Sequence, residues 1–244
     1  MNADRRMAAV ARAGIHQVVS RIRQQPMIVP LGRKSHVWAV RGMSASTKAF
    51  YANPPDVEMA VWQKLLVAGD LFVDVGANVG TYSLIACEAG AEVIAVEPND
   101  QARRWLMKNI ELNGYRADVR SVALSDQPGQ VRITVDLGTT NRIDPAGGQI
   151  VEVDTLDSLI GERHAYVKVD VEGHELQVLR GGARALEEQR LLAVQLEWNA
   201  CADRTPVSEL LADYGYEVMQ ALPNGDLVPA GDTLHDIVAV PKTS

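Results

Sequence analysis

Cysteine, aromatic residues and basic charge are all scarce in this 244-residue sequence. Its two cysteines, Cys87 and Cys201, lie far apart, which excludes a disulfide framework and a zinc site with short ligand spacing. Lysine and arginine number 24 against 31 acidic residues, whereas a general nucleic-acid binder needs a clustered basic excess. We therefore expect a small-molecule or glycan partner and no nucleic acid.

Long apolar runs are also missing. No stretch approaches the length of a membrane span, and the N-terminus lacks an apolar region followed by a small-residue cleavage site. We expect a soluble, cytoplasmic chain. Its 47% hydrophobic content suits one substantial core, so we predict one domain over residues 61–244 and an extension over residues 1–60 that covers the substrate.

The extension divides into two parts. Residues 1–25 combine five arginines with apolar residues at helical spacing, which predicts an amphipathic helix. That helix could pack on its own domain, which we favour, or bind a membrane surface or a partner. The proline-containing segment 25–55 predicts short strands and turns, and a second helix is expected over residues 57–67.

From Leu71 onward strand and helix patterns alternate, which is typical of a parallel sheet covered on both faces. The spacing of glycines and apolar residues predicts helices over 79–88, 101–113, 175–186 with a break at Gly181-Gly182, and 206–214. Two later apolar runs, 216–222 and 235–240, predict a hairpin joined through Asn224-Gly225. The expected strands are Leu71–Val75, Glu92–Val96, Val119–Leu124, Ala165–Val171 and Leu191–Glu197.

The stretch FVDVGANVGTYSLIA, residues 72–86, predicts a ligand site at the end of the first strand. Gly76 and Gly80 permit positive φ and close approach of the backbone, but the order of residues departs from the G-x-G-x-x-G of dinucleotide folds. Asp74 before the turn would repel a pyrophosphate and attract an ammonium, as in S-adenosylmethionine. Glu97, which ends the next strand, can accept ribose hydroxyls. Alternatively, Asp74 caps the following helix and Glu97 is a solvated charge.

These residues resemble the FkbM family of class I methyltransferases, from about Trp62 through the C-terminus. The resemblance implies a Rossmann-like fold, a mostly parallel seven-stranded sheet with a terminal antiparallel hairpin. It also implies methyl transfer from S-adenosylmethionine, commonly to a hydroxyl of a sugar or secondary metabolite. The matching blocks are FVDVGANVGTYSLIA, VIAVEPN, VALSDQPG, VDTLDSL and YVKVDVEGHELQVLRGG, in that order.

Carried over residue by residue, the resemblance supplies a set of cofactor residues. Ser125 and Asp126 match the segment that flanks the adenine, although a polar turn with Pro128-Gly129 would explain them equally well. The expected cofactor-binding residues are Asp74, Gly76, Ala77, Asn78, Gly80, Glu97, Asn99, Ser125 and Asp126.

A hydroxyl acceptor needs its proton removed, so a base is expected near the transferred methyl group. The segment YVKVDVEGHELQ places Lys168, Asp170 and Glu172 on one side of the fourth strand, followed by His174. His174 titrates near neutrality and is our candidate base, with a solvent-facing residue as the alternative. Glu197 closes the neighbouring strand. The expected catalytic residues are thus His174, Asp170, Glu172 and Glu197.

Three further expectations concern a metal ion, the substrate and other functions. Asp170, Glu197 and Asn199 offer oxygen ligands for Mg²⁺, but hydrogen bonding without a metal is favoured. The loop over residues 137–149 is expected to contact substrate through Thr139, Thr140 or Asn141. A cofactor-binding but catalytically silent partner module, an N- or carboxyl-methyltransferase, and a nicotinamide dehydrogenase are the alternative functions.

Overall fold

The computed structural model describes residues 26–39, 57–135, 142–146, 148–198, 204–231 and 236–242. The expected helix over residues 1–25 therefore lies outside the described residues, and so do Asn199 and the candidate substrate residues Thr139, Thr140 and Asn141. No helix within the described ranges is long and apolar enough to cross a membrane.

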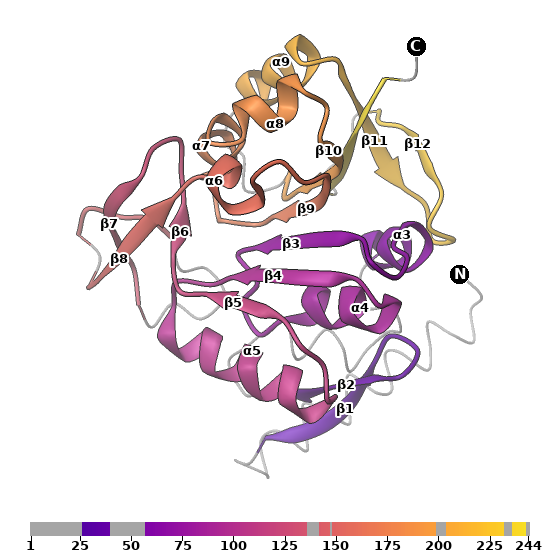
Figure 1. The fold of residues 1–244 in the computed structure, drawn as a ribbon, viewed down its shortest axis with the longest axis vertical. Coiled ribbons are helices and arrows are strands. Elements are labelled where there is room, and N and C mark those ends of the chain that lie inside the picture. The colour runs from indigo at the N-terminus through magenta and orange to yellow at the C-terminus, as the bar shows by residue number, and fades with distance from the viewer. Residues whose placement is uncertain are drawn as a thin grey trace.

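An eight-stranded sheet forms the centre of the molecule (Figure 1). Its order is β12-β11-β13-β10-β9-β3-β4-β5, and the pairs from β5 to β10 are parallel. β13 is antiparallel to both of its neighbours, so the expected mostly parallel sheet with an antiparallel end is confirmed. The strands are β3 (Leu71–Val75), β4 (Glu92–Val96), β5 (Asp118–Arg120), β9 (Ala165–Val169), β10 (Leu191–Leu196), β11 (Tyr216–Ala221), β12 (Leu227–Pro229) and β13 (Ile237–Pro241).

The expected third strand over residues 119–124 is wrong. The chain pairs with β4 only over Asp118–Arg120 and then leaves the sheet. Residues 123–124 form β6 in a separate three-stranded sheet, because Ala123 packs with Ile133, Val151 and Val153 away from the main sheet. The members of that sheet are β6 (Ala123–Leu124), β7 (Gly129–Ile133) and β8 (Gln149–Asp154).

The C-terminal hairpin also differs in its connection. β11 and β13 do pair antiparallel, but the turn at Asn224-Gly225 leads from β11 into the extra edge strand β12. Gly225 has a φ of 81°, and the side chain of Asn224 accepts a hydrogen bond from the amide of Asp226, so the turn closes locally. The sheet therefore has one strand more than predicted.

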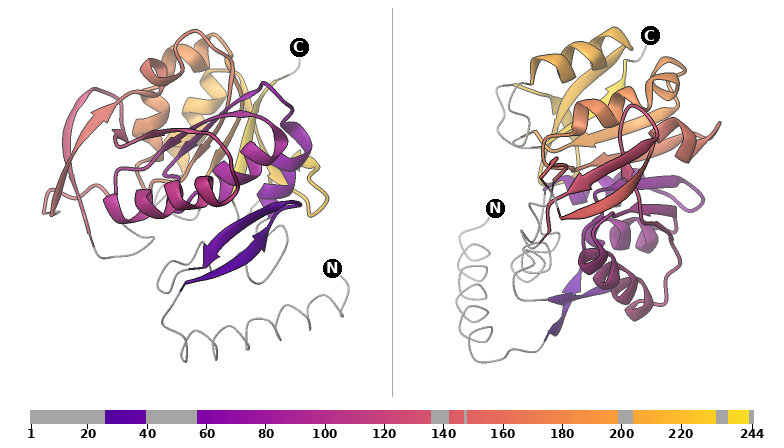
Figure 2. Two further views of the ribbon diagram at one scale, coloured as in Figure 1. Left: turned by 60° about the horizontal axis from the view of Figure 1, so that its bottom comes forward. Right: turned by 90° about the vertical axis from the view of Figure 1, so that its left-hand side faces the viewer.

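Helices cover both faces of the sheet (Figures 1 and 2). One face carries α3 (Val57–Leu65), α4 (Thr81–Ala89) and α5 (Asp100–Leu112), and the other carries α6 (Leu156–Ile160), α7 (Glu175–Arg180), α8 (Ala183–Glu187) and α9 (Thr205–Asp213). The helices predicted from residue 57 onward are confirmed with small changes at their ends, including the break at Gly181-Gly182, whereas α6 was not predicted.

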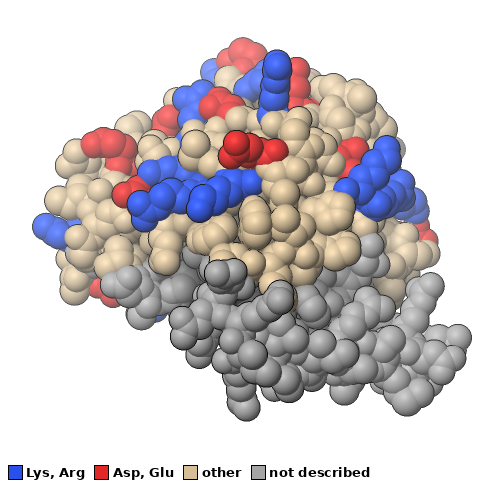
Figure 3. Space-filling view, turned by 90° about the horizontal axis from the view of Figure 1, so that it is seen from below, with Lys and Arg blue, Asp and Glu red and all other residues tan. Residues whose placement is uncertain are grey.

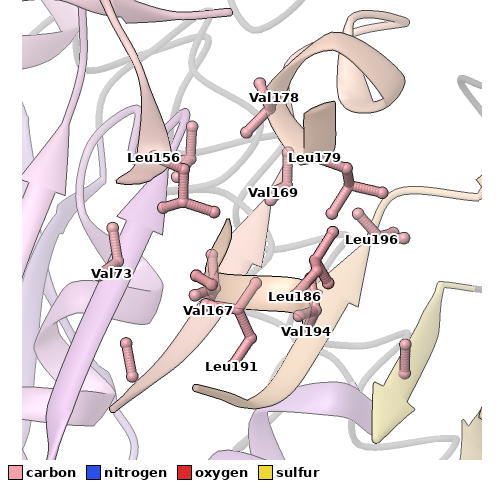
Figure 4. Packing of buried hydrophobic residues seen from close by; sticks show 14 of the residues in the cluster. Val73, Leu156, Val167, Val169, Val178, Leu179, Leu186, Leu191, Val194 and Leu196 are labelled. Atoms are coloured by element: carbon pink, nitrogen blue, oxygen red, sulfur yellow. The ribbon is translucent and has the colours of Figure 1, made fainter. Parts of the chain in front are cut away.

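The core consists of two layers because strand side chains alternate between the faces. Val73, Val167 and Val194 point toward the helices α6 to α9, where they pack with Leu156, Leu179 and other aliphatic residues (Figure 4). Phe72 points the other way, toward α3 and α4. Each fully buried aliphatic side chain contributes roughly 1.5–3 kcal/mol. If one strand shifted by one residue, its side chains would all turn to the opposite face of the sheet. The packing of both layers therefore fixes the pairing register and the positions of the residues at the strand ends.

A hairpin of β1 (Met27–Leu31) and β2 (Ser35–Ala39) confirms the short strands expected before the domain. Glu88 at the end of α4 accepts hydrogen bonds from the amides of residues 33, 34 and 35 at 2.7–2.8 Å. On α5, Asn109 and Asn113 accept from the amides of Trp38 and His36 at 2.8 and 2.7 Å. These polar side chains attach the hairpin to the domain. Whether the extension covers the substrate stays a prediction.

Candidate functional site

Parallel register brings the functional side chains to one edge of the sheet. Val96, Val75, Val169, Leu196 and Ile237 are successive partners across five neighbouring strands. The residues that extend this row at the strand ends include Glu97, Gly76, Asp170, Glu197 and, because β13 runs the opposite way, Asp236. This is the carboxyl edge, where ligands of open α/β sheets bind.

Asp74 has two carboxylate oxygens in different environments. Its side chain is fully buried, and Oδ2 accepts hydrogen bonds from Ser83 N at 2.9 Å and Ser83 Oγ at 2.6 Å. Oδ1 lies 3.9 Å from Lys168 Nζ and has no hydrogen-bond partner among the described residues. Burial raises the pKa of Asp74, and Lys168 opposes this. Asp74 thus binds the first turn of α4 through one oxygen, while its second oxygen makes no hydrogen bond among the described residues.

Glu97 binds the loop that follows β3. Its Oε2 accepts from Asn78 N and its Oε1 from Asn99 N, both at 2.8 Å. The side chain is buried, and burial raises its pKa to about 7 although both amides favour the charged form. Asn99 itself caps α5, because its Oδ1 accepts from Gln101 N and Ala102 N. Glu97 is therefore a preorganised carboxylate at the second strand end.

The two glycines of the loop are required by packing within the protein. Gly76 has a φ of 75°, and a Cβ there would lie 1.9 Å from the carbonyl oxygen of Asp170. Gly80 has a φ of 87°, and its Cβ would lie 2.3 Å from Leu106 Cδ1. The amides of Gly76 and Ala77 both donate to Val96 O at 3.0 Å. The sequence suggested that a ligand approaches these glycines closely, but the backbone of Asp170 does so at Gly76 and the side chain of Leu106 at Gly80.

His174 lies beside the Ser125–Asp126 turn. Its Nε2 is 2.9 Å from Ser125 Oγ, which is also 3.1 Å from Asp126 Oδ1. Burial lowers the pKa of His174, and Asp126 partly opposes this. The structure thus brings three of the predicted residues together, with the histidine ring joined to the segment that was expected to flank the adenine.

Three carboxylates meet beyond β9 and β10. Asp170, Glu172 and Glu197 each offer an oxygen within 4.8 Å of the others, so they could hold a divalent cation. Burial and Asp170 raise the pKa of Glu197 to about 9, and Glu172 has a raised pKa for the same reasons. The close carboxyls therefore favour binding of a proton by the cluster. β9 ends at Val169, two residues earlier than expected, and Glu172 lies in the turn that follows, with a φ of 55°.

Two further residues contribute to the site. The sequence placed Lys168 beside Asp170 and Glu172 but gave it no role, and it did not single out Gln195. Lys168 is 3% exposed, and its Nζ donates to Asp170 Oδ2 at 2.9 Å. Gln195 is fully buried, with Oε1 accepting from Trp62 Nε1 at 2.6 Å and Nε2 donating to Tyr82 OH at 3.1 Å and Asp236 Oδ2 at 3.0 Å. A single polar residue inside an otherwise apolar strand, as in LLAVQL, is the signal that could have identified Gln195.

Comparison with known proteins agrees with this geometry. The family model described as the methyltransferase FkbM domain matches residues 74–218. Hexuronic acid methyltransferase AglP of Haloferax volcanii is 31% identical over 151 residues, which cover 59% of this chain and 62% of the relative. The alignment thus spans less than two thirds of that relative's length.

Solved structures with a similar chain path include methyltransferase FkbM from Methylobacillus flagellatus, with 15% identity, a TM-score of 0.49, and coverage of 70% of this chain and 43% of that one. A TehB-like SAM-dependent methyltransferase from Corynebacterium glutamicum has 13% identity and a TM-score of 0.48, and the match covers 82% of this chain and 95% of that one. The family match includes the strand ends that carry Asp74, Glu97, Asp170 and Glu197. This chain belongs to the methyltransferase FkbM domain family.

Proposed function

We propose that this protein transfers the methyl group of S-adenosylmethionine to a hydroxyl group of a sugar. The observation that carries the proposal is the row of carboxylates along the carboxyl edge of the sheet. Asp74 and Glu97 suit a cationic methyl donor. The second group, which suits removal of a proton from the acceptor, consists of Asp170, Glu172 and Glu197. The proposal takes the acceptor class from the hexuronic acid named for the relative.

Asp74 and Glu97 are the residues that would hold the donor. The buried Oδ1 of Asp74 lacks a hydrogen-bond partner among the described residues, which suits the ammonium of the methionine portion. Glu97 keeps lone pairs on both oxygens after accepting two amides, so it can accept the ribose hydroxyls. The bound S-adenosylmethionine would supply an activated methyl group. Ser125 and Asp126 would lie beside its adenine, and His174 would contact Ser125.

Asp170 is our proposed base, with Glu197 as its hydrogen-bonded partner. A base must lie within hydrogen-bond reach of the acceptor hydroxyl, and Asp170 is joined to Lys168 in a partly exposed position at the edge. His174 is less suited than the sequence suggested, because its Nε2 is engaged by Ser125. His174 would instead position the Ser125 turn.

A hexuronic acid also offers a carboxylate, so the carboxyl group is the second candidate acceptor. A carboxylate needs no base, and its negative charge would be repelled by the ionised members of the acidic cluster. This favours the hydroxyl. A catalytically silent module is disfavoured by the same cluster, since three carboxylates held close together cost stability.

A small acceptor also agrees with the surface charge. On the face shown in Figure 3, lysine and arginine side chains form separate groups with acidic side chains among them. Nucleic-acid binding would favour a continuous basic track. We therefore retain a glycan or other small molecule as the partner.

Transfer of a deuterated methyl group tests the proposal. The protein is incubated with S-adenosylmethionine carrying CD₃ and with paired glucosides and glucuronides, and the products are analysed by mass spectrometry. We expect a labelled product that survives mild alkali, because ethers resist hydrolysis and methyl esters do not. An alkali-labile product would establish the carboxyl acceptor, and bound cofactor without transfer to any acceptor would support the silent module.

A further inference from the structure

Lys168 occupies a position between the two groups of carboxylates. On β9 it is the direct partner of Asp74 on β3 and of Gln195 on β10. Its Nζ donates to Asp170 Oδ2 at 2.9 Å, lies 3.9 Å from Asp74 Oδ1, and sits 4.8 Å from the centre of the Tyr82 ring. One buried cation thus contacts an acid from the donor side and an acid from the acceptor side.

A buried ion pair of this kind is poorly explained by stability alone. Well-packed apolar residues of similar volume are often as stabilising as a buried ion pair, since removing charges from water is costly. The surroundings are built to keep the ammonium in place: the ring of Tyr82 faces it, and Gln195 fixes the hydroxyl of that ring at 3.1 Å. The cation is therefore held by Asp74 of β3, by Tyr82 of α4 and by Asp170 just after its own strand.

We propose that Lys168 is a positioning residue for methyl transfer, an inference that rests on the proposed function. Its ammonium holds Asp170 on the acceptor side at a fixed separation from Asp74 on the donor side. Asp74 is also held by two hydrogen bonds from Ser83, and its nearer oxygen lies 3.9 Å from the ammonium. The side chain of Asp170 is 38% exposed and accepts a hydrogen bond from the ammonium at 2.9 Å, in addition to its contact with Glu197. Loss of the ammonium should therefore displace Asp170 more than Asp74.

The two kinetic constants separate this role from a merely structural one. In Lys168→Met the donor acid keeps its bonds to Ser83, so the Kd of S-adenosylhomocysteine should stay within about threefold of wild type. Turnover should fall by about tenfold or more, because misplacement of a reacting group by about 1 Å is costly. Lys64→Met is the matched control, since Lys64 pairs with Asp226 on the exposed surface and should keep normal turnover.

A double-mutant cycle tests whether Lys168 acts through Asp170. Turnover is measured for Lys168→Met, Asp170→Asn and the double variant, with folding checked by thermal unfolding. If Lys168 works by holding Asp170, the double variant should be no slower than Asp170→Asn. Additive losses, or normal turnover in Lys168→Met, would overturn the inference.

A folding defect in Lys168→Met and a failure of the proposed function must each be separated from a failure of the positioning role. If Lys168→Met does not fold, Lys168→Arg keeps a cation but moves it, so a lowered kcat with unchanged cofactor affinity is expected and a normal kcat overturns the inference. If the wild-type protein binds S-adenosylhomocysteine but methylates no acceptor, the proposed function fails and this role fails with it. A wild-type enzyme whose turnover is insensitive to Lys168 contradicts the positioning role alone.

Discussion

Replacement of Glu97 by glutamine should change how the stability of the protein depends on pH. Burial raises the pKa of this side chain from its ordinary 4.5 to about 7. Between these values the folded protein holds a proton that the unfolded chain releases, so stability falls as pH rises through this window. The difference corresponds to about 3 kcal/mol, at about 1.4 kcal/mol per pH unit. Glutamine cannot ionise, so the unfolding free energy of Glu97→Gln should not fall by this amount as pH rises.

The assay is chemical denaturation at pH 5 and pH 8. Between these pH values, wild type should lose about 2–3 kcal/mol more of its unfolding free energy than Glu97→Gln does. Glu92→Gln is the control, because Glu92 is exposed at the start of the same strand and should behave as wild type does. If the unfolding free energy of Glu97→Gln fell as much between pH 5 and pH 8 as that of wild type, the reasoning that this buried carboxyl binds a proton near neutrality would be refuted.

Ligand binding should depend on the same proton. Ribose hydroxyls donate to the ionised carboxylate, so the affinity for S-adenosylhomocysteine should rise as pH increases from 6 to 8. Glu97→Ala should weaken binding by about 1.5–3 kcal/mol, the range for hydrogen bonds to a charged group. Calorimetry measures both effects, and an unchanged affinity in the alanine variant would remove Glu97 from the site.

Three other predictions concern the loop, the base and the metal. Gly76→Ala should destabilise the fold by more than about 2 kcal/mol in denaturation, because its Cβ would overlap a carbonyl oxygen, while Gly129→Ala, with open space around it, should stay within about 0.5 kcal/mol. Asp170→Asn should lower turnover by about 10²-fold and His174→Ala by less than tenfold; the reverse order would restore the histidine as base. Turnover should survive EDTA, whereas a loss restored by Mg²⁺ would make the acidic cluster a metal site.

Much of the fold follows from local patterns in the sequence. Strands such as Leu71–Val75 are short apolar runs between glycine-containing turns, and the helices between them have clear ends, so alternation predicted a parallel sheet. The early departure of the chain after Arg120 was not predictable in this way. Ala123 continues an apolar run, but its partners Val151 and Val153 lie about thirty residues later in the sequence.

The site was predicted less completely than the fold. Asp74 and Glu97 are recognisable because one lies just before the end of a strand and the other directly after one, and the structure brings both to the carboxyl edge. The roles of Lys168 and Gln195 depend on neighbours from three other elements, which no local pattern reports. For the same reason the engagement of His174 by Ser125, 49 positions earlier, could not be read from its place before a helix.

Titration of the protein with S-adenosylhomocysteine and, separately, with NAD tests the central claim most directly. Asp74 and Glu97 at adjacent strand ends should bind S-adenosylhomocysteine at one site per chain, and Asp74→Asn should weaken this binding while leaving the fold intact. NAD should not bind, because the buried carboxylate of Asp74 would repel its pyrophosphate. Tight binding of NAD with no response to S-adenosylhomocysteine would contradict the account.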